Sequence, residues 1–152
     1  MRADVVIYCT GYKISFPFFD EDLLAAPDNQ IDLFRRVFHP DIPNVFFVAL
    51  LQPLGAMMPL AEVQGSWVAS YLKGEYALPP RTQLLRDIAE DKAAMRSRYV
   101  ASKRHTIQVD FDDYLVHTDR ERKRGAARAR AAGFALPVPR RTPVAVSEAV
   151  AA

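Results

Sequence analysis

Two short glycine-containing turns are the segments of this sequence best suited to contact a bound nucleotide. Thr10-Gly11-Tyr12 comes just after the apolar run Val5–Tyr8. Gln52-Pro53-Leu54-Gly55 follows a second apolar run, Val45–Leu51, and precedes a helical pattern that starts near Pro59. In open α/β sheets, ligands bind beyond the carboxyl ends of the strands, where helix N-termini also point. Both turns are therefore candidate cofactor contacts.

Each turn also has an interpretation without a ligand. Gly11 fits an ordinary turn, although Thr10 and Tyr12 beside it are compatible with a nucleotide-facing segment, and both interpretations stay open. The segment Gln52–Gly55 fits a tight strand-to-helix connection. Because Gln52 is polar in an apolar stretch and Gly55 lies close by, we favour a ligand there. The helix N-terminus would stabilise an anionic group or a flavin that gains negative charge on reduction.

No catalytic residue and no metal site is predicted. Cys9 is the single cysteine, which excludes an internal disulfide and favours a reducing, cytoplasmic compartment. Nothing cationic lies next to it in sequence, so we expect a small buried hydrophobe rather than a redox thiol. His39, His105 and His117 are widely spaced and match no metal-ligand pattern. The glycines form no GxGxxG motif, so a dinucleotide fingerprint is absent from these residues.

Charge and hydropathy argue against two classes of partner. The net charge of +2 is too small to indicate a polyanionic partner. A basic stretch at Arg120–Arg130 could contact nucleic acid, but it lacks interleaved aromatic residues and is more typical of a solvated tail. No apolar run approaches the ~18 residues of a membrane span. We therefore predict neither nucleic-acid binding nor a transmembrane helix.

The expected elements follow from apolar periodicity and turn residues. Continuous β-branched runs predict buried strands, and a repeat with Trp67 inward predicts a helix that ends at Lys73-Gly74. Thr82 is a candidate N-cap of a second helix. The elements expected are strands at Val5–Tyr8 and Val45–Leu51, a short exposed strand at Leu33–Phe38, helices at Pro59–Lys73 and Thr82–Tyr99, a loop or strand at Thr106–Phe111, and a short helix at Asp112–Thr118.

These elements predict an α/β fold that is incomplete by itself. Buried parallel strands need neighbours on both edges and cover on both faces, and these residues supply too few of either. The pattern is that of a C-terminal fragment of a doubly wound domain with a helical C-terminal extension. We expect residues 1–118 to form that part. Residues 119–152 are basic and rich in alanine and proline, which predicts a poorly ordered tail.

Three segments resemble the C-terminal part of the flavin-containing monooxygenases. They are DVVIYCTGYKISFPF at 4–18, IDLFRRVFHPDIPNVFFVALLQPLGAMMPLAEVQGSWVASYLKG at 31–74 and TIQVDFDDYL at 106–115. They stand in the order and spacing of the family and extend over most of residues 3–118. The block from Val48 to Trp67 is long and specific, which makes the resemblance strong.

The resemblance implies an FAD/NAD(P)-binding flavoprotein with two dinucleotide-binding domains. FAD reduced by NADPH would react with O₂ to oxygenate a small-molecule substrate at a soft nitrogen or sulfur atom. By position, Thr10-Gly11-Tyr12 resembles the segment that returns from the NADP domain to the FAD domain. Gln52-Pro53-Leu54-Gly55 resembles the turn beside the flavin, and the helix from Pro59 resembles the one aimed at the isoalloxazine.

One departure from the family leaves two functional hypotheses open. The Gly-rich fingerprints that hold the FAD and NADPH pyrophosphates are absent from these 152 residues. The chain is then either part of a flavin-containing monooxygenase or a non-catalytic truncated remnant. A half-protein that needs a separately encoded N-terminal partner belongs to the second hypothesis. We expect these residues alone to bind FAD weakly, if at all.

Overall fold

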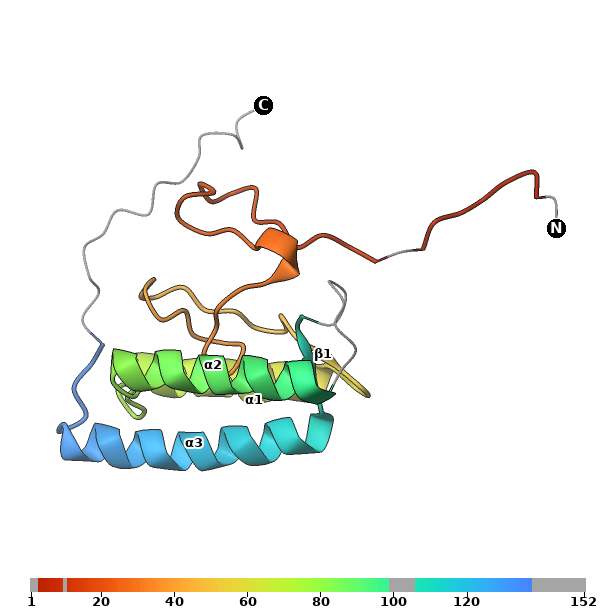
Figure 1. Ribbon diagram of the computed structural model, residues 1–152. Coiled ribbons are helices and arrows are strands. Elements are labelled where there is room, and N and C mark those ends of the chain that lie inside the picture. The colour runs from red at the N-terminus through yellow and green to blue at the C-terminus, as the bar shows by residue number, and fades with distance from the viewer. Residues whose placement is uncertain (1–2, 10, 99–105, 138–152) are drawn as a thin grey trace.

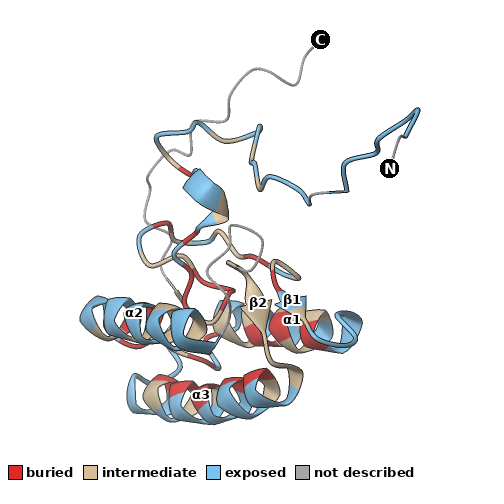
Figure 2. Ribbon diagram, turned by 45° about the vertical axis from the view of Figure 1, so that its right-hand side comes forward, coloured by how far each residue is buried: buried red, intermediate tan, exposed pale blue. Residues whose placement is uncertain are grey.

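In a computed structural model, which describes residues 3–9, 11–98 and 106–137, three α-helices form most of the regular structure (Figure 1). They are α1 (Met58–Leu72), α2 (Arg81–Arg98) and α3 (Phe111–Ala131). In both ribbon views α3 runs alongside the other two helices, and residues 3–9 extend away from them (Figures 1 and 2). A 3₁₀ turn, η1 (Pro27–Asn29), lies in the loop-rich N-terminal region.

The sheet among the described residues is a short parallel pair. Strand β1 (Gln52–Pro53) lies beside β2 (Gln108–Val109), with Gln52 opposite Gln108 and Pro53 opposite Val109. The N–H of Gln52 donates to the carbonyl of Ile107 at 2.8 Å. A helix follows each strand after a short connection, so the chain mixes helix and strand as expected.

Helix α1 forms where the periodicity predicts it. Pro59 lies in the first turn, where its missing N–H removes no hydrogen bond, and Trp67 is fully buried. Lys73 is the C-cap, and Gly74 takes a φ of +74°, which glycine adopts without strain. The predictions for the ends of this helix and for the core position of Trp67 are confirmed.

The segment Leu33–Phe38, predicted as an exposed strand, is instead a buried tight turn. Phe34 and Phe38 form an antiparallel bridge, in which the N–H of Phe34 donates to the carbonyl of Phe38 at 2.8 Å. The Phe38 ring meets Trp67 edge-on at a centroid distance of 5.2 Å. Burial of these rings supplies the main apolar cluster, whose buried members are Phe34, Val37, Phe38, Trp67, Tyr76, Leu84 and Ile88.

The predicted buried strand at Val5–Tyr8 is wrong in this structure. The segment is not a strand, and its side chains are 65–81% exposed. Cys9 is exposed as well, so the prediction of a buried thiol is also wrong. A β-branched run becomes a buried strand only when other strands pair with its backbone, and none does so among the described residues.

The second predicted strand, Val45–Leu51, is mostly irregular. Phe46 forms a single antiparallel bridge with Phe38. Ala49 has a φ of +64°, a left-handed conformation that interrupts an extended chain. Regular pairing begins only at Gln52, where the sequence predicted a turn. Burial of Phe47 and Leu51 explains the apolar run, because both side chains fill the core without a strand.

Helix α2 matches its prediction in extent, but not in every residue. It begins at Arg81, so Thr82 lies inside its first turn and the prediction of Thr82 as the N-cap is wrong. Leu84 and Ile88 are buried on its inner face, whereas Leu85 is exposed. The predicted last residue, Tyr99, lies outside the described residues.

Helix α3 is much longer than predicted. The carboxylate of Asp110 accepts a hydrogen bond from the N–H of Asp113, so Asp110 is the N-cap of the helix. The helix then continues to Ala131, and the prediction of a poorly ordered tail is wrong for residues 119–131. Glu121, Gly125 and Ala129 are spaced four residues apart and form a buried stripe (Figure 2). The remainder of the predicted tail, residues 138–152, lies outside the described residues.

Candidate functional site

The connection between β1 and α1 presents backbone and apolar side chains to solvent. Gln52 is exposed and Pro53 is half-buried within β1, and Leu54 and Gly55 follow in an exposed turn. Gly55 has a φ of +133°, a conformation that favours glycine, and a Cβ added there would meet no atom within 4 Å. Free space around this backbone would let a ligand approach it closely.

A patch of apolar side chains surrounds the start of α1. Leu54, Met57 and Met58 are all exposed. Met57 is the N-cap residue and has no side-chain capping bond, so the N-terminus of α1 lacks a capping oxygen. Further along α1, a Cβ on Gly65 would also meet nothing within 4 Å. An apolar ring with an anionic edge, such as a flavin, fits this combination of surface and helix end.

The other predicted cofactor segment lies elsewhere. Thr10 is outside the described residues, Gly11 has a φ of +96°, and Tyr12 is 97% exposed. The carbonyl of Tyr12 accepts from Asn29 Nδ2 at 3.1 Å, and the N–H of Ile14 donates to Asn29 Oδ1 at 2.7 Å. These bonds attach the segment to η1. In the part of the chain that the structure describes, no hydrogen bond joins it to Gln52–Gly55.

Sequence reasoning missed a buried hydrogen-bond chain that supports α1. Gln64 Oε1 accepts from the N–H of Ala49 at 2.8 Å, and its Nε2 donates to the phenol oxygen of Tyr114 at 2.7 Å. Tyr114 donates in turn to the carbonyl of Arg35 at 2.8 Å. Burial raises the pKa of Tyr114 to about 12. The sequence signal for this chain was the position of Gln64, three residues before Trp67, which places a polar side chain on the buried face of the helix.

A second missed cluster attaches α3 to the segment after α1. The hydroxyl of Tyr76 donates to Glu121 Oε1 at 2.9 Å, and Arg128 Nη2 donates to the same oxygen at 2.5 Å. Arg128 Nε also donates to the carbonyl of Ala77 at 3.0 Å. Burial, with the neighbouring Glu121 charge, raises the pKa of Tyr76. Glu121 is thus the shared hydrogen-bond acceptor of Tyr76 and Arg128, which indicates that the cluster has a structural role.

The histidines form no metal site with the residues that the structure describes. No group of three or more His, Cys, Asp or Glu side chains is gathered for an ion in these segments. His39 Nδ1 accepts from the backbone N–H groups of Asp41 and Ile42, and burial lowers the pKa of His39. His105 lies outside the described residues. Nor does any helix among residues 3–9, 11–98 and 106–137 have the length and hydropathy of a bilayer span.

Comparison with known proteins identifies the class to which this strand–turn–helix arrangement belongs. A sequence model of the family described as flavin-binding monooxygenase-like matches residues 2–122. The match includes both predicted cofactor segments, the whole of α1 and α2, and the first half of α3. The chain belongs to this family. Membership implies an FAD/NAD(P)-binding flavoprotein fold and a flavin cofactor.

Individual relatives support the same assignment. The chain is 42% identical over 114 residues to flavin-containing monooxygenase 5 of Rattus norvegicus, and 41% identical over 114 residues to that of Homo sapiens. It is 34% identical over 115 residues to dimethylaniline monooxygenase [N-oxide-forming] 2 of Rattus norvegicus. Each alignment includes 74% of this chain but only 21–22% of the relative's length.

Proposed function

We propose that this chain supplies the C-terminal part of the FAD-binding domain of an NADPH-dependent flavin monooxygenase. The observation that carries the proposal is the family match over residues 2–122, which includes the exposed Gln52–Gly55 turn at the start of α1. Residues 1–118 would form that part of a doubly wound domain. The cytoplasmic location suggested by the single cysteine remains a prediction.

The flavin would be held at the β1–α1 turn. Bound there and reduced by NADPH, it would supply the O₂ chemistry that oxygenates a soft nitrogen or sulfur atom of a small molecule. The protein's own contribution would be to position the flavin ring and to shield it from water. Gly55 would let the backbone approach the ring, Leu54 and Met58 would cover its apolar face, and the α1 N-terminus would favour charge at its edge.

A second candidate is a non-catalytic remnant, or a half-protein that needs a separately encoded N-terminal partner. The apolar segment Val5–Tyr8 is exposed and has no pairing strand among the described residues, as expected of a segment made to join a larger sheet. The 152 residues also contain no GxGxxG motif to hold a pyrophosphate. Both features favour the half-protein, in which flavin binds only when further polypeptide completes the site.

Flavin titration with and without such polypeptide tests the proposal. The chain is mixed with FAD alone, and then with FAD and a polypeptide that carries the two glycine fingerprints of the family. We expect quenching of FAD fluorescence and NADPH oxidation only in the second mixture. Absence of both would contradict the monooxygenase proposal and favour the remnant.

A pair of glycine variants tests the proposed position of the flavin. Gly55→Ala adds a Cβ at the turn, where the φ of +133° also strains any other residue. Gly133→Ala makes the same change after α3, at a φ of +70° and with nothing within 4 Å. We expect Gly55→Ala alone to weaken FAD binding in the completed protein. Equal affinity of the two variants would exclude the β1–α1 turn as the flavin contact.

A further inference from the structure

Two adjacent arginines lie beside a small cleft that is separate from the proposed flavin contact. Arg35 and Arg36 occupy the centre of the Phe34–Phe38 turn. The cleft beside them is also lined by α2, which contributes Met95, and by the β2–α3 junction at Asp110. Its volume is about 160 Å³. Pockets for drug-sized ligands measure roughly 300–1,000 Å³, so this space suits a small ion.

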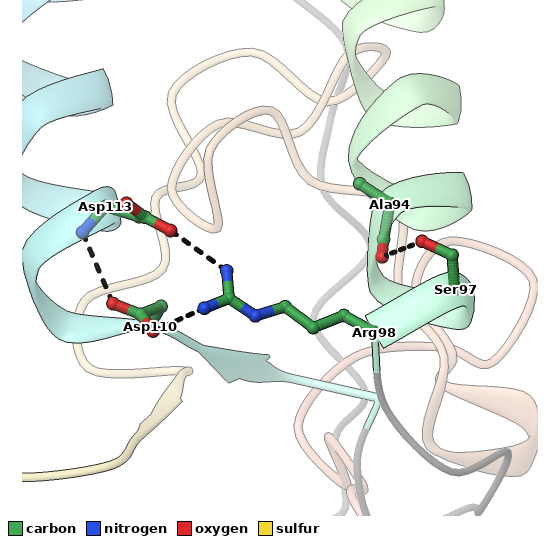
Figure 3. A network of polar contacts seen from close by, with 5 residues as sticks. All are labelled: Ala94, Ser97, Arg98, Asp110 and Asp113. Atoms are coloured by element: carbon green, nitrogen blue, oxygen red, sulfur yellow. Dashed lines mark hydrogen bonds and ion pairs between the residues drawn. The ribbon is translucent and has the colours of Figure 1, made fainter.

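The carboxylates around the cleft are already paired with other arginines. Arg98 donates from Nη2 to Asp110 and from Nη1 to Asp113, each at 2.9 Å (Figure 3). Arg35 Nη1 lies 3.0 Å from Asp91 Oδ1. Each of these guanidinium groups therefore has a negative partner within its own salt bridge.

Arg36 differs from its neighbours because it has no such partner among the described residues. It is only 9% exposed, and its Nη2 donates to the thioether sulfur of Met95 at 3.3 Å. No carboxylate lies within ion-pair distance of Arg36 in the described part of the chain. A thioether is a weak acceptor and carries no charge. Asp91 and Asp32 favour the charge of Arg36 electrostatically, but they form ion pairs with Arg35 and Lys92. The positive charge of Arg36 is thus buried without an ion pair of its own among these residues.

A buried guanidinium without an ion pair of its own is unfavourable. Arginine stays protonated in proteins, so it cannot relieve the penalty by losing its proton, even though burial lowers the pKa of Arg36. Buried charges in proteins are normally paired with an opposite charge or hydrogen-bonded to several acceptors. An anion in the adjoining cleft would supply both.

The backbone holds the two arginines in a strained conformation. Arg35 and Arg36 have φ values of +50° and +61°, in the left-handed region that non-glycine residues rarely adopt. The Phe34–Phe38 bridge fixes the ends of the turn, and Tyr114 binds the carbonyl of Arg35. Strain of this kind is often retained where it positions functional side chains.

We propose that this cleft binds a small oxyanion of the phosphate or carboxylate type, with Arg36 as its main contact and Arg35 beside it. The planar guanidinium presents parallel N–H donors that match two oxygens of such an anion. The bound anion would provide the direct ion pair that Arg36 lacks among the described residues. This site is independent of the proposed flavin contact, and its test uses no flavin.

Inorganic phosphate is the probe. The full chain is titrated calorimetrically with phosphate, with sodium chloride at equal ionic strength as the reference, since salt alone screens surface charges. We expect wild type to bind phosphate and to gain thermal stability beyond the chloride control. Arg36→Met should reduce the affinity about tenfold or more, because it removes the charged donor. Arg96→Met, an exposed change on α2, is the control and should bind as wild type does.

A second variant moves the affinity in the opposite direction. Asp91→Asn removes the partner of Arg35 and leaves two uncompensated guanidinium groups at the cleft, so phosphate should bind several-fold more tightly. Without phosphate, Arg36→Met should melt no lower than wild type, because it removes an unpaired buried charge. The proposal is overturned if wild type responds equally to phosphate and chloride, or if Arg36→Met and Arg96→Met bind phosphate equally.

Discussion

The amide of Gln64 on α1 donates a hydrogen bond of 2.7 Å to the phenol oxygen of Tyr114 on α3. The same amide accepts from Ala49, and Tyr114 continues the chain to the carbonyl of Arg35. Gln64 is fully buried, so water cannot replace a bond that is lost. The Gln64 side chain therefore links α1 to α3 and to the segment that precedes β1.

Replacing Gln64 by leucine should destabilise the fold without changing the volume of the core much. The N–H of Ala49 would lose its acceptor in a partly buried position. We expect a loss of about 1–3 kcal/mol in the free energy of unfolding, measured by urea denaturation. Gln83→Leu is the matched control, because the Gln83 side chain makes no hydrogen bond among the described residues.

Combining Gln64→Leu with Tyr114→Phe measures the bond between the two side chains. If they act as one network, the double variant should lose less stability than the two single losses added together. The expected coupling is about 1 kcal/mol. Strict additivity would show that the 2.7 Å contact contributes nothing to stability.

Gly125→Ala should be strongly destabilising, although alanine is the better helix former. A Cβ at this position would clash with the ring of Tyr76, which is buried against Phe38 and Trp67. Overpacking of this kind costs about 1–3 kcal/mol, and more where the ring cannot move. Thermal denaturation followed by circular dichroism measures the effect.

Gly65→Ala is the matched control for the helix propensity of glycine. It makes the same change in the interior of α1, where a new Cβ meets no atom within 4 Å. We expect it to stabilise the chain by ~0.5–1 kcal/mol. If Gly125→Ala were also stabilising, the close packing of Tyr76 on α3 would be disproved.

Glu121→Ala should separate α3 from the rest of the fold more than any exposed change on that helix. Tyr76 and Arg128 would both lose their shared acceptor, and the Arg128 charge would remain partly buried. We expect a loss of about 3 kcal/mol, with faster amide hydrogen exchange along the second half of α3.

Lys123→Ala provides the comparison on the same helix. Lys123 pairs with Asp119 at 2.7 Å, but both side chains are largely exposed, and such pairs contribute roughly 0–1 kcal/mol. Its hydrogen exchange should therefore match that of wild type. Equal losses of stability for Glu121→Ala and Lys123→Ala would mean that the Glu121 cluster contributes no more to stability than an exposed ion pair.

The sequence predicted what depends on local pattern. Helix α1 and its ends were foreseeable because the apolar repeat, Pro59 and Gly74 all act within one or two turns of chain. The exposed conformation of Val5–Tyr8 could not be predicted in this way, because a buried strand forms only if distant segments pair with it. The family match was likewise predictable, since the block around Gln52–Gly55 is contiguous.

Two errors have a more specific origin. Arginine and alanine dominate the composition of the second half of α3, which is typical of a tail, yet Glu121, Gly125 and Ala129 recur every four residues and mark a packing face.

The Phe34–Phe38 turn has the composition of a strand, and nothing in the sequence indicates a left-handed conformation at two arginines. The contacts that hold it come from Trp67 and Tyr114, which are far away in sequence.

Stability should fall at alkaline pH through Tyr114. Burial raises the pKa of its phenol to about 12, whereas an unfolded tyrosine titrates near ~10. Between these values the folded chain retains a proton that the unfolded chain releases, so this contribution is complete below pH ~10 and is lost as the pH rises through about 12. Tyr76 acts in the same direction, because burial and the Glu121 charge raise its pKa too.

Urea denaturation at a series of pH values from neutral to strongly alkaline measures this effect. Tyr114→Phe lowers stability at every pH, because it loses two hydrogen bonds, but its alkaline slope should be shallower than that of wild type. Tyr12→Phe changes a 97% exposed residue and should leave the slope unchanged. Parallel curves for wild type and Tyr114→Phe would show that the Tyr114 phenol titrates alike in both states, and would contradict its burial beside Gln64.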